Sequence, residues 1–461
     1  MLYSDDTIAA ISTGNSGNSG IGIIRMSGSS SIEIIDKIFK SKNGKKKMCE
    51  VNTHTIHFGN IIDNGNPVDE VLVMIMKGPN SYTREDVVEI NCHGGMTVMN
   101  KVLEICFDNG ARPAQPGEFT KRAFLNGRID LSQAEAVIEL IQSKNELSMK
   151  SSINLLSGYL SDKIKKHREV ILNDIAFIEA ALDDPEHISL DNFSDKLRED
   201  ISIISNDLEE LIVTSDNGRV IKEGINTVIL GKPNAGKSSL LNVLARYERA
   251  IVTDIPGTTR DVIEEQVNLN GVFLNLIDTA GIRDTEDKVE SIGVDKAKNC
   301  AQNADLIIYV VDSSVPFDDN DKEILELVRD KNVIIILNKS DLLSVVTKEF
   351  IEEITDFPVV SISTKTLDGI KDFENLIYKM FMSGKIYEND EIMITNQRQK
   401  NSLKDALKSL KLVLNSIDEC MPEDFYTIDL MNAYEELGKI TGESVEEDLV
   451  NEIFSKFCMG K

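Results

Sequence analysis

The sequence predicts a multidomain protein: an α+β N-terminal domain, an all-α helical domain made of two flanks, and an α/β domain inserted between the flanks. Three patterns in the 461-residue chain lead to this prediction. Short β-type runs alternate with helical stretches at the start. Long helical apolar seams follow, and they return near the end. Between the seams, near-continuous Val/Ile/Leu strands alternate with helices, which is typical of a parallel sheet covered on both faces.

The changes of pattern set the predicted boundaries. These are residues 1–125 for the N-terminal domain, 126–221 for the first helical flank, 222–384 for the inserted domain and 385–461 for the second helical flank. In the first flank, apolar residues repeat at helical spacing at Ile164, Ile171, Ile175, Ile178 and Leu182. Helices with such seams need a partner, so the two flanks are expected to pack together.

Composition narrows the function classes. The net charge of −27 argues against a protein that coats nucleic acid by bulk attraction. The six cysteines are scattered without a CxxC pair, which is typical of reduced thiols in a cytoplasmic protein. No run of 18 apolar residues and no apolar leader is present, so we expect no membrane association.

A phosphate-binding motif opens the inserted domain. Gly231–Ser238 reads GKPNAGKS, follows the apolar run INTVIL and precedes the helical stretch SSLLNVLARY. This is the strand–loop–helix context that the P-loop requires, because its backbone N–H groups wrap phosphate oxygens at a helix N-terminus. Lys237 is expected to pair with the β- and γ-phosphates, and Ser238 is expected to ligate Mg²⁺.

Four further stretches follow in the order found in GTPases. They are Thr258–Asp261 (TTRD), Asp278–Gly281 (DTAG), Asn338–Asp341 (NKSD) and Ser361–Ser363 (SIS). The carboxylate of Asp341 can accept both N1–H and N2–H₂ of guanine, a donor pair that adenine lacks. The sequence therefore predicts a guanine nucleotide site.

The residues that would drive hydrolysis are less clear. Ile282 stands where Ras-like GTPases use a glutamine to orient water. Arg260 and Arg283 are candidate arginine fingers, although such residues are often structural. A second hypothesis is that the loop Val252–Thr259 and Asn234 encircle K⁺ beside the phosphates; the alternative is an ordinary solvated switch loop.

Taken together, these stretches resemble the MnmE (TrmE) family of tRNA modification GTPases. The terminal FCMGK, with PGEF at Pro116–Phe119 and RAFLN at Arg122–Asn126, makes the resemblance specific, and it covers nearly the whole chain. It implies a folate-binding and dimerisation domain over residues 1–125 and a K⁺-dependent G domain over 222–384. The loop Gly14–Gly20 departs from the family pattern, and Pro256 stands where alanine is common.

The resemblance implies an enzyme that hydrolyses GTP in the cytoplasm. It would act as a homodimer, in a heterotetramer with an FAD-dependent MnmG-type subunit, on the wobble uridine (position 34) of certain tRNAs. It would add a carboxymethylaminomethyl-type group to C5 from a tetrahydrofolate derivative. The alternative is a ribosome-assembly GTPase that binds rRNA, a class that usually carries a basic appendage.

The resemblance also carries over site residues. The Mg²⁺ ligands would be Ser238 and Thr259; the K⁺ ligands would be Asn234, Thr253, Ile255 and Thr258; and the folate contacts would be Arg25, Glu89, Arg128 and Lys461. The GTP contacts would be Asn234, Ala235, Gly236, Lys237, Ser238, Ser239, Thr253, Asp254, Ile255, Pro256, Gly257, Thr258, Thr259, Asp278, Thr279, Ala280, Gly281, Asn338, Lys339 and Asp341.

Three residues are candidates for catalysis. They are Lys237, Glu290, which matches the family's water-orienting glutamate, and Cys458. A helical surface glutamate is the alternative for Glu290. Cys458 is either a reactive thiol near the one-carbon unit or a small half-buried residue beside a folate-binding Lys461, and the residues alone leave both interpretations open.

Overall fold

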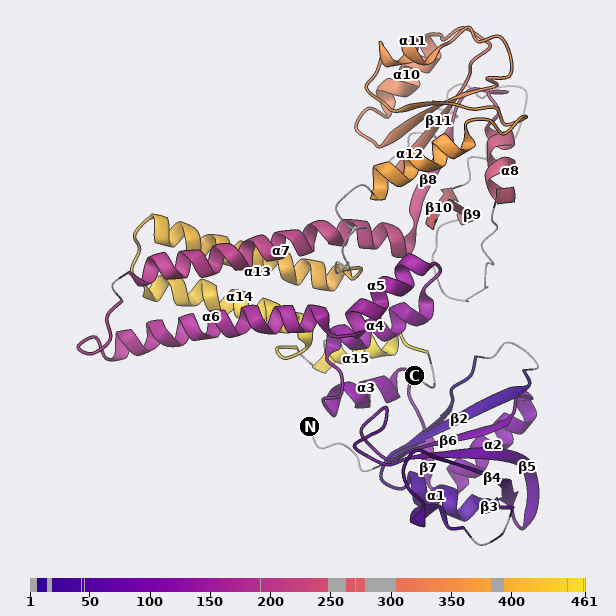
Figure 1. Ribbon diagram of the computed structural model, residues 1–461, viewed down its shortest axis with the longest axis vertical. Helices are drawn as coiled ribbons and strands as arrows, with labels where there is room; N and C mark the ends of the chain where they lie inside the picture. The colour runs from indigo at the N-terminus through magenta and orange to yellow at the C-terminus, as the bar shows by residue number, and fades with distance from the viewer. Residues whose placement is uncertain are drawn as a thin grey trace. The chain divides into compact units, whose positions relative to one another are not determined.

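The computed structural model describes residues 6–14, 19–42, 44, 46–190, 192–247, 263–269, 271–277, 304–382, 394–445, 447–458 and 460. The chain forms two compact units. Unit 1 holds residues 1–142, 152–206 and 401–461, and unit 2 holds residues 143–151 and 207–400. Figure 1 shows the elements of each unit. No helix in the described ranges has the length and apolar character that crossing a membrane requires.

Unit 1 begins with a seven-stranded sheet in the order β3-β4-β5-β6-β2-β1-β7. Only β1 and β7 pair in parallel among its strands; the other neighbours are antiparallel. The bounds are β1 Thr7–Ile11, β2 Ile21–Ser27, β3 Phe39–Ser41, β4 Thr55–Asp63, β5 Asn66–Met76, β6 Val87–His93 and β7 Ala111–Pro113.

One face of this sheet is buried, whereas the opposite face is open over β4 and β5 but covered at Ile8 and Ala10 of β1. The buried face packs against helices α1 (Ser31–Ile38) and α2 (Met96–Asp108), near the 3₁₀ turn Met48–Glu50. Ile24, Val73 and Ile90 alternate into that core, as period-2 strands require. The opposite face therefore carries the intervening side chains of the same strands.

Long helices form the rest of unit 1. The elements here are α3 Glu118–Leu125, α4 Leu131–Gln142, α6 Tyr159–Asp183, the first half of α7 (Phe193–Glu223), α13 Gln397–Asp418, α14 Asp424–Thr441 and α15 Glu447–Ser455. Helices α6, α7, α13 and α14 lie side by side (Figure 1). The prediction that the two helical flanks pack together is confirmed. The predicted seam was wrong at Leu182, which is 49% exposed because α6 ends one residue later.

The last residues of the chain are docked within unit 1. Phe454 and Phe457 pack with Ala123 and Leu131 in one apolar cluster. Beyond them, the N–H of Gly117 donates to the Cys458 carbonyl (3.4 Å), and the Ser12 hydroxyl donates to the Gly460 carbonyl (3.0 Å). The tail is thus held between the end of β1 and the start of α3.

A buried acid in the bundle leads to a first prediction. Asp174 on α6 is 1% exposed; burial raises its pKa, opposed by Lys196 at 3.3 Å. A raised folded pKa means that the buried charge costs stability at neutral pH and that this cost disappears as the pH falls through that pKa. We expect Asp174→Asn to stabilise the bundle by about 1 kcal/mol at pH 7. Thermal unfolding should show the gain shrinking toward pH 4, and an equal gain at every pH would contradict the prediction.

Unit 2 is built on a six-stranded sheet in the order β13-β12-β11-β8-β10-β9. All neighbours pair in parallel except β9, which is antiparallel to β10. The bounds are β8 Ile225–Leu230, β9 Ile263–Leu269, β10 Val272–Ile277, β11 Leu306–Asp312, β12 Val333–Asn338 and β13 Val359–Ser361. The five apolar runs read from the sequence are β8 and β10–β13, whereas the polar strand IEEQVNL of β9 was not predicted.

Helices cover both faces of this sheet. Side chains such as Ile308 and Ile336 face α8 (Lys237–Tyr247) and α12 (Ile370–Met382), in one core cluster. The alternate residues Ile307 and Ile335 face α10 (Asp319–Leu327) and α11 (Lys348–Glu352), in another. This is the predicted Ras-like α/β fold, and it places the carboxyl ends of β8, β11 and β12 at one edge.

A short segment from the first helical flank also belongs to unit 2. Residues 143–151, which include the start of α5 (Glu146–Leu156), pack on the β9–β10 hairpin. Asn145 Nδ2 donates to the carbonyls of Gly271 (3.0 Å) and Ile221 (3.2 Å), and Leu147 packs against the sheet core. The compact units therefore divide the chain near residues 207 and 400, whereas the predicted domain boundaries are 222 and 384.

Candidate functional site

The P-loop between β8 and α8 is shaped by two close approaches. A Cβ at Gly231 would lie 2.3 Å from the Val310 carbonyl oxygen, and a Cβ at Gly236 would lie 2.0 Å from Asn338 Nδ2. Both glycines also have positive φ angles, of 150° and 100°. Only glycine fits these two places, and the loop that they shape leads directly into the N-terminus of α8, where backbone N–H groups can bind a phosphate.

Lys237 occupies the middle of this loop. Its Nζ donates to the carbonyls of Gly231 and Lys232, at 2.7 Å each, and burial lowers its pKa. The Lys237 ammonium is partly desolvated and hydrogen-bonded to neutral carbonyls. Moving it to negatively charged phosphate oxygens would therefore be electrostatically favourable. Ser238 and Ser239 follow it and are exposed in the first turn of α8, where a hydroxyl can reach a phosphate-bound cation.

Asn338 ties the P-loop to the end of β12. The side chain is fully buried, its Nδ2 donates to the Ala235 carbonyl (2.9 Å), and its Oδ1 accepts from the Thr364 N–H (3.3 Å). One side chain thus links three loops at the carboxyl edge of the sheet. The predicted GTP contacts from Asn234 to Ser239 and from Asn338 to Asp341 are therefore brought together.

Two further residues of the NKSD motif, Lys339 and Asp341, are held by an ion pair and a hydroxyl group. Asp341 Oδ1 accepts from the Ser363 hydroxyl at 2.8 Å, and its side chain is 19% exposed. Lys339 Nζ pairs with Asp312 Oδ2 at the end of β11. Burial alone would raise the pKa of Asp312, but the hydrogen bond from Lys339 and the other contacts of Asp312 together outweigh burial and lower this pKa. With its position fixed by Ser363, the Asp341 carboxylate can hydrogen-bond to guanine. With its ammonium held by Asp312, the aliphatic part of Lys339 can pack on the guanine ring.

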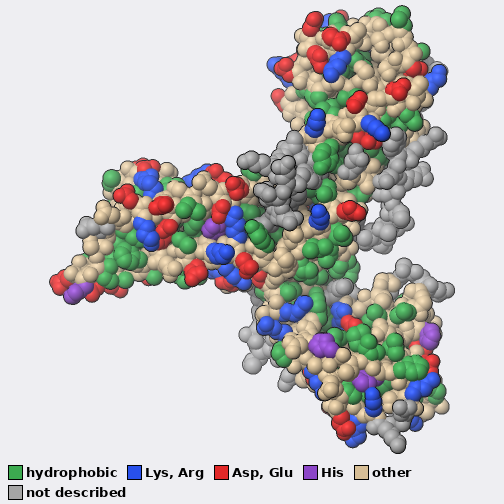
Figure 2. Space-filling view, viewed as in Figure 1, with side chains coloured by type: hydrophobic (Ala, Val, Ile, Leu, Met, Phe, Trp, Pro, Cys, Tyr) green, Lys and Arg blue, Asp and Glu red, His purple; other side chains and the backbone are tan. Residues whose placement is uncertain are grey.

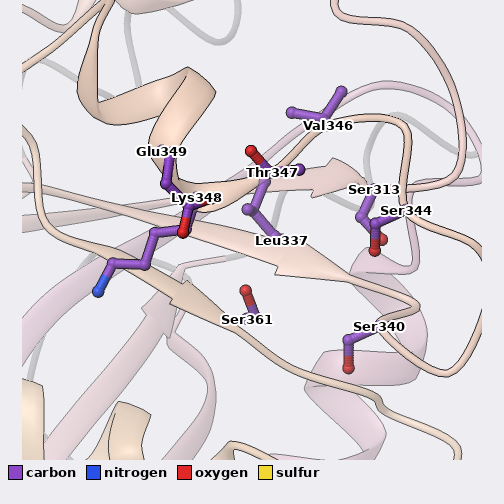
Figure 3. Close-up of a pocket in the computed structure, with 9 residues that line it drawn as sticks. All are labelled: Ser313, Leu337, Ser340, Ser344, Val346, Thr347, Lys348, Glu349 and Ser361. Atoms are coloured by element: carbon purple, nitrogen blue, oxygen red, sulfur yellow. The ribbon is translucent and has the colours of Figure 1, made fainter.

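A small pocket lies beside this loop, on the α11 side of the sheet (Figure 3). Its volume is about 220 Å³, and none of the residues that line it belongs to the P-loop. The lining residues are Ser313, Leu337, Ser340, Ser344, Val346, Thr347, Lys348, Glu349 and Ser361. Ser340 of the NKSD motif lines the pocket, but none of the predicted GTP contacts does.

Several predicted site residues lie outside the described residues. These are Thr253, Asp254, Ile255, Pro256, Gly257, Thr258 and Thr259 of the switch loop, Asp278, Thr279, Ala280 and Gly281 of DTAG, together with Glu290 and Lys461. Their roles stay predictions. Of the proposed K⁺ and Mg²⁺ ligands, Asn234 and Ser238 are described, and both are exposed on the P-loop.

A second candidate site lies on the N-terminal sheet. Arg25 on β2 and Glu89 on β6 are register partners, and both Nε and Nη2 of Arg25 donate to Glu89 Oε1, at 2.8 and 2.7 Å. The Tyr82 ring lies between two guanidinium groups, 5.4 Å from Arg25 and 4.7 Å from Arg128. Three of the four predicted folate contacts thus lie around one aromatic ring.

Sequence reasoning gave no role to Tyr82 or to Phe119. The Phe119 ring centroid lies 5.7 Å from Arg25, and the Tyr82 hydroxyl is 2.9 Å from that of Thr120. The signal available was weak: Tyr82 stands in the stretch GPNSYT at Gly78–Thr83 and Phe119 in PGEF, but a single aromatic residue usually belongs to a hydrophobic core. The pairing of Arg25 with Glu89 was also not predicted; both contacts of Arg25 are to Oε1, so a ligand that binds both oxygens of Glu89 would share Oε1 with Arg25.

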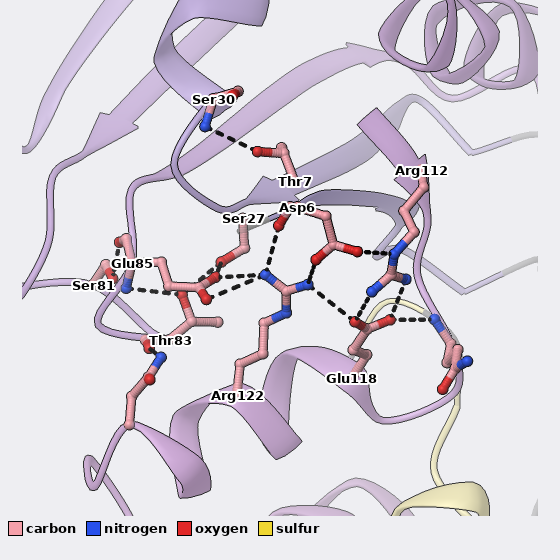
Figure 4. A network of polar contacts seen from close by, with 12 residues as sticks. Asp6, Thr7, Ser27, Ser30, Ser81, Thr83, Glu85, Arg112, Glu118 and Arg122 are labelled. Atoms are coloured by element: carbon pink, nitrogen blue, oxygen red, sulfur yellow. Dashed lines mark hydrogen bonds and ion pairs between the residues drawn. The ribbon is translucent and has the colours of Figure 1, made fainter. Parts of the chain in front are cut away.

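The PGEF and RAFLN stretches meet in a buried ion-pair network (Figure 4). Arg122 is 2% exposed and contacts Asp6 (2.8 Å), Glu85 (3.1 Å) and Glu118 (3.1 Å). Glu118 also pairs with Arg112 at 2.6 Å. Burial alone would raise the pKa of Glu118, but the hydrogen bonds that Glu118 accepts, chiefly from the two arginines, together outweigh burial and lower this pKa. These bonds join α3 to residues next to β1 and β6, and so they hold the fold around the second candidate site.

The fold and the first site define a class of protein: a P-loop GTPase domain with a guanine-reading NKxD loop, carried by additional α+β and helical parts. Comparisons extend this. Residues 7–128 match the family model "GTP-binding protein TrmE N-terminus", and residues 131–458 match "MnmE helical domain". The chain is 59% identical over 456 residues to the tRNA modification GTPase MnmE of Lachnoclostridium phytofermentans, covering 99% of each chain.

It is also 50% identical over 466 residues to the MnmE of Acetivibrio thermocellus, covering 100% of each chain. Among solved structures, the G domain of the T. maritima FeoB iron transporter is 27% identical over 34% of this chain and 99% of that chain, with a TM-score of 0.26. The chain belongs to the MnmE family of tRNA modification GTPases. It is a GTP-binding enzyme that acts in tRNA modification.

Proposed function

We propose that this GTPase modifies the wobble uridine at position 34 of certain tRNAs, together with an FAD-dependent MnmG-type subunit in a heterotetramer. The group added to C5 is of the carboxymethylaminomethyl type, and its one-carbon unit comes from a tetrahydrofolate derivative. The observation that carries the folate part is the Arg25–Glu89 pair beside Tyr82 and Arg128. The family match over residues 7–128 and 131–458 favours this over a ribosome-assembly GTPase that binds rRNA.

The residues around Arg25 suit the parts of a folate. A pterin has an amide edge with adjacent N–H donors that a carboxylate such as Glu89 can accept, and a flat ring that can stack on Tyr82 or Phe119. Arg25 and Glu89 have side chains that are 16% and 15% exposed, so the pair is ordered yet reachable. Arg128 and Lys461 are proposed to supply cations for the glutamate moiety of the cofactor.

The bound folate would supply the one-carbon unit. The role of this chain is to hold and orient it: Arg25 fixes the Glu89 carboxylate, and the tail contacts Ser12–Gly460 and Gly117–Cys458 fix the end of the chain. Cys458 is exposed in the structure. We propose a site role for its thiol without covalent catalysis.

The open face of the N-terminal sheet supports the homodimer. Ile56 and Phe58 on β4 and Leu72 on β5 are 60%, 47% and 44% exposed, and Phe58 is the register partner of Leu72. Figure 2 shows hydrophobic side chains on the surface of this part of the chain. Such a set of adjacent exposed apolar side chains on one sheet face is typical of a surface covered by another protein. We propose that the second copy covers it.

The GTPase cycle is proposed to depend on Mg²⁺ and K⁺. Ser238 and Thr259 would hold Mg²⁺, and Asn234 would join Thr253, Ile255 and Thr258 around K⁺. The side-chain oxygen of Asn234 is an exposed ligand of the right kind, at a residue whose φ of 64° bends the loop outward. Bound K⁺ would supply the positive charge that an arginine finger supplies elsewhere. Glu290 would orient water.

Folate binding gives the direct test. We expect calorimetric titration of 5-formyltetrahydrofolate into the full-length protein to show binding that Glu89→Gln weakens by about tenfold or more, because an amide cannot accept two N–H donors at once. Ending the chain after Phe457 should also weaken binding, since Phe454 and Phe457 keep their packing while the residues beyond them are lost.

The matched control is Glu70→Gln. Glu70 lies on β5 and pairs with Lys42 on the surface, so its neutralisation should leave folate binding unchanged. If the wild-type protein binds GTP but not the folate, or if both glutamate variants bind it equally well, the assignment of the second site is wrong.

A further inference from the structure

Lys232, the second residue of the P-loop, has a side chain that the phosphate chemistry described above does not use. Its Nζ lies 2.6 Å from Asp318 Oδ2 and 2.5 Å from Asp321 Oδ2, at the start of α10. The P-loop is therefore tied to a helix on the α10/α11 face of the sheet. The Lys232 side chain is 25% exposed, so the ion pair is partly desolvated and its contribution depends on close, well-oriented contacts.

The two carboxylates on α10 are themselves fixed. Asp318 and Asp321 form a reciprocal cap, in which each side chain accepts the backbone N–H of the other. Asp321 is 3% exposed, and its Oδ1 accepts from the buried hydroxyl of Tyr309 on β11, at 2.6 Å. The Lys232 ammonium thus meets an acceptor pair that is held by a helix and by a central strand.

The same residue also holds Lys237. The carbonyl of Lys232 accepts from Lys237 Nζ at 2.7 Å and from the Ala235 N–H at 3.3 Å. The side chain of Lys232 is anchored outside the loop, while its backbone forms part of the loop interior. A change at the anchor therefore alters the shape into which the phosphates must fit.

We propose that Lys232 is a positioning residue of the GTPase cycle, which keeps the P-loop in its phosphate-ready shape through Asp318 and Asp321. It acts on nucleotide capture and does not touch the reacting atoms. A preformed loop avoids the cost of ordering backbone groups when the nucleotide binds, so the link raises the association rate and the affinity.

Lys232→Met in the full-length protein is the test, because methionine keeps much of the apolar stem and removes the charge. With a fluorescent GDP analogue, we expect about tenfold weaker binding, mostly through slower association. The KM for GTP should rise in parallel, while kcat at saturating GTP stays within about twofold. Lys232→Arg should restore binding, since a guanidinium can reach both carboxylates.

Two further variants separate this role from a general loss of stability. Lys322→Met removes an exposed ion pair with Asp319 on the same helix and should change neither binding nor KM. Asp321→Asn should weaken nucleotide binding, and adding it to Lys232→Met should not weaken binding further, because the ammonium that Asp321 pairs with is then already absent. The bonds of Asp321 to Tyr309 and to the Asp318 N–H bear on the stability of α10, which a melting curve measures separately. If Lys232→Met does not fold, Asp318→Asn weakens the same pair from a 54% exposed side chain.

Three results would overturn the proposal. One is unchanged GDP association in Lys232→Met with only a lower melting temperature, which would make the ion pair merely structural. Another is a large loss of kcat that Lys232→Arg does not restore, which would place Lys232 on the nucleotide itself. The third is additivity of Lys232→Met and Asp321→Asn.

Discussion

Replacing Arg122 by methionine is expected to destabilise the N-terminal part of unit 1 by about 3–5 kcal/mol. The change leaves the carboxylates of Asp6, Glu85 and Glu118 close together around a 2% exposed position, with only Arg112 as a remaining cation among the described contacts. Buried like charges without their partner carry the full cost of desolvation and repulsion. Denaturant unfolding of the full-length protein, monitored by the susceptibility of the N-terminal sheet to proteolysis, measures the change in the free energy of unfolding.

Two comparisons give this result its meaning. Arg122→Lys should recover only part of the loss, since one ammonium cannot reach all three carboxylates in the way that the guanidinium fork does. Lys37→Met removes the exposed Lys37–Glu33 pair of the same unit and should cost less than about 1 kcal/mol. Wild-type stability in Arg122→Met would mean that the network contributes no net stability.

Asp341→Asn is expected to weaken GDP binding by about 10²–10³-fold. In the proposed site the carboxylate held by Ser363 would accept two N–H groups of guanine, whereas an amide presents a donor to one of them. Xanthosine diphosphate has a carbonyl in place of the guanine amino group, so the asparagine variant should bind it better than GDP. Equilibrium titration with both nucleotides measures this exchange of preference.

The control for this variant lies in the neighbouring loop. Asp368 is exposed and accepts from the Thr366 hydroxyl, so Asp368→Asn removes a nearby negative charge without changing a base contact. It should leave both affinities unchanged. Equal binding of GDP by Asp341→Asn and the wild type would show that guanine is read elsewhere.

Much of unit 2 could be predicted because its signals are local. Strands such as β11 and β12 are apolar throughout, and the P-loop and NKSD motif each fit within eight residues. Strand β9 was missed because it is an edge strand, and its sequence IEEQVNL has too few apolar residues to stand out. Leu182 was wrongly predicted to be buried, because the apolar spacing continues into the last turn of α6 whereas the burial of that helix face ends before it.

The interactions that sequence reasoning missed join residues far apart in the chain. Arg122 meets Asp6 across 116 positions, and Lys232 meets Asp321 through a helix that follows β11. A single sequence shows that such residues are charged but not which charges face each other. The same holds for Arg25 and Glu89, which the family resemblance placed in one site but whose direct bond only the sheet register explains.

The docked tail has a consequence for how the protein is made. The cluster around Ala123 and Leu131 is completed by Val450, Ile453, Phe454 and Phe457, and Ser12, which follows β1, gains a hydrogen-bond acceptor at Gly460. A ribosome adding about 5–20 residues per second needs tens of seconds to reach these residues after Leu131 emerges. The nascent N-terminal part therefore waits with an open apolar surface, and a chain that stops early keeps that surface exposed.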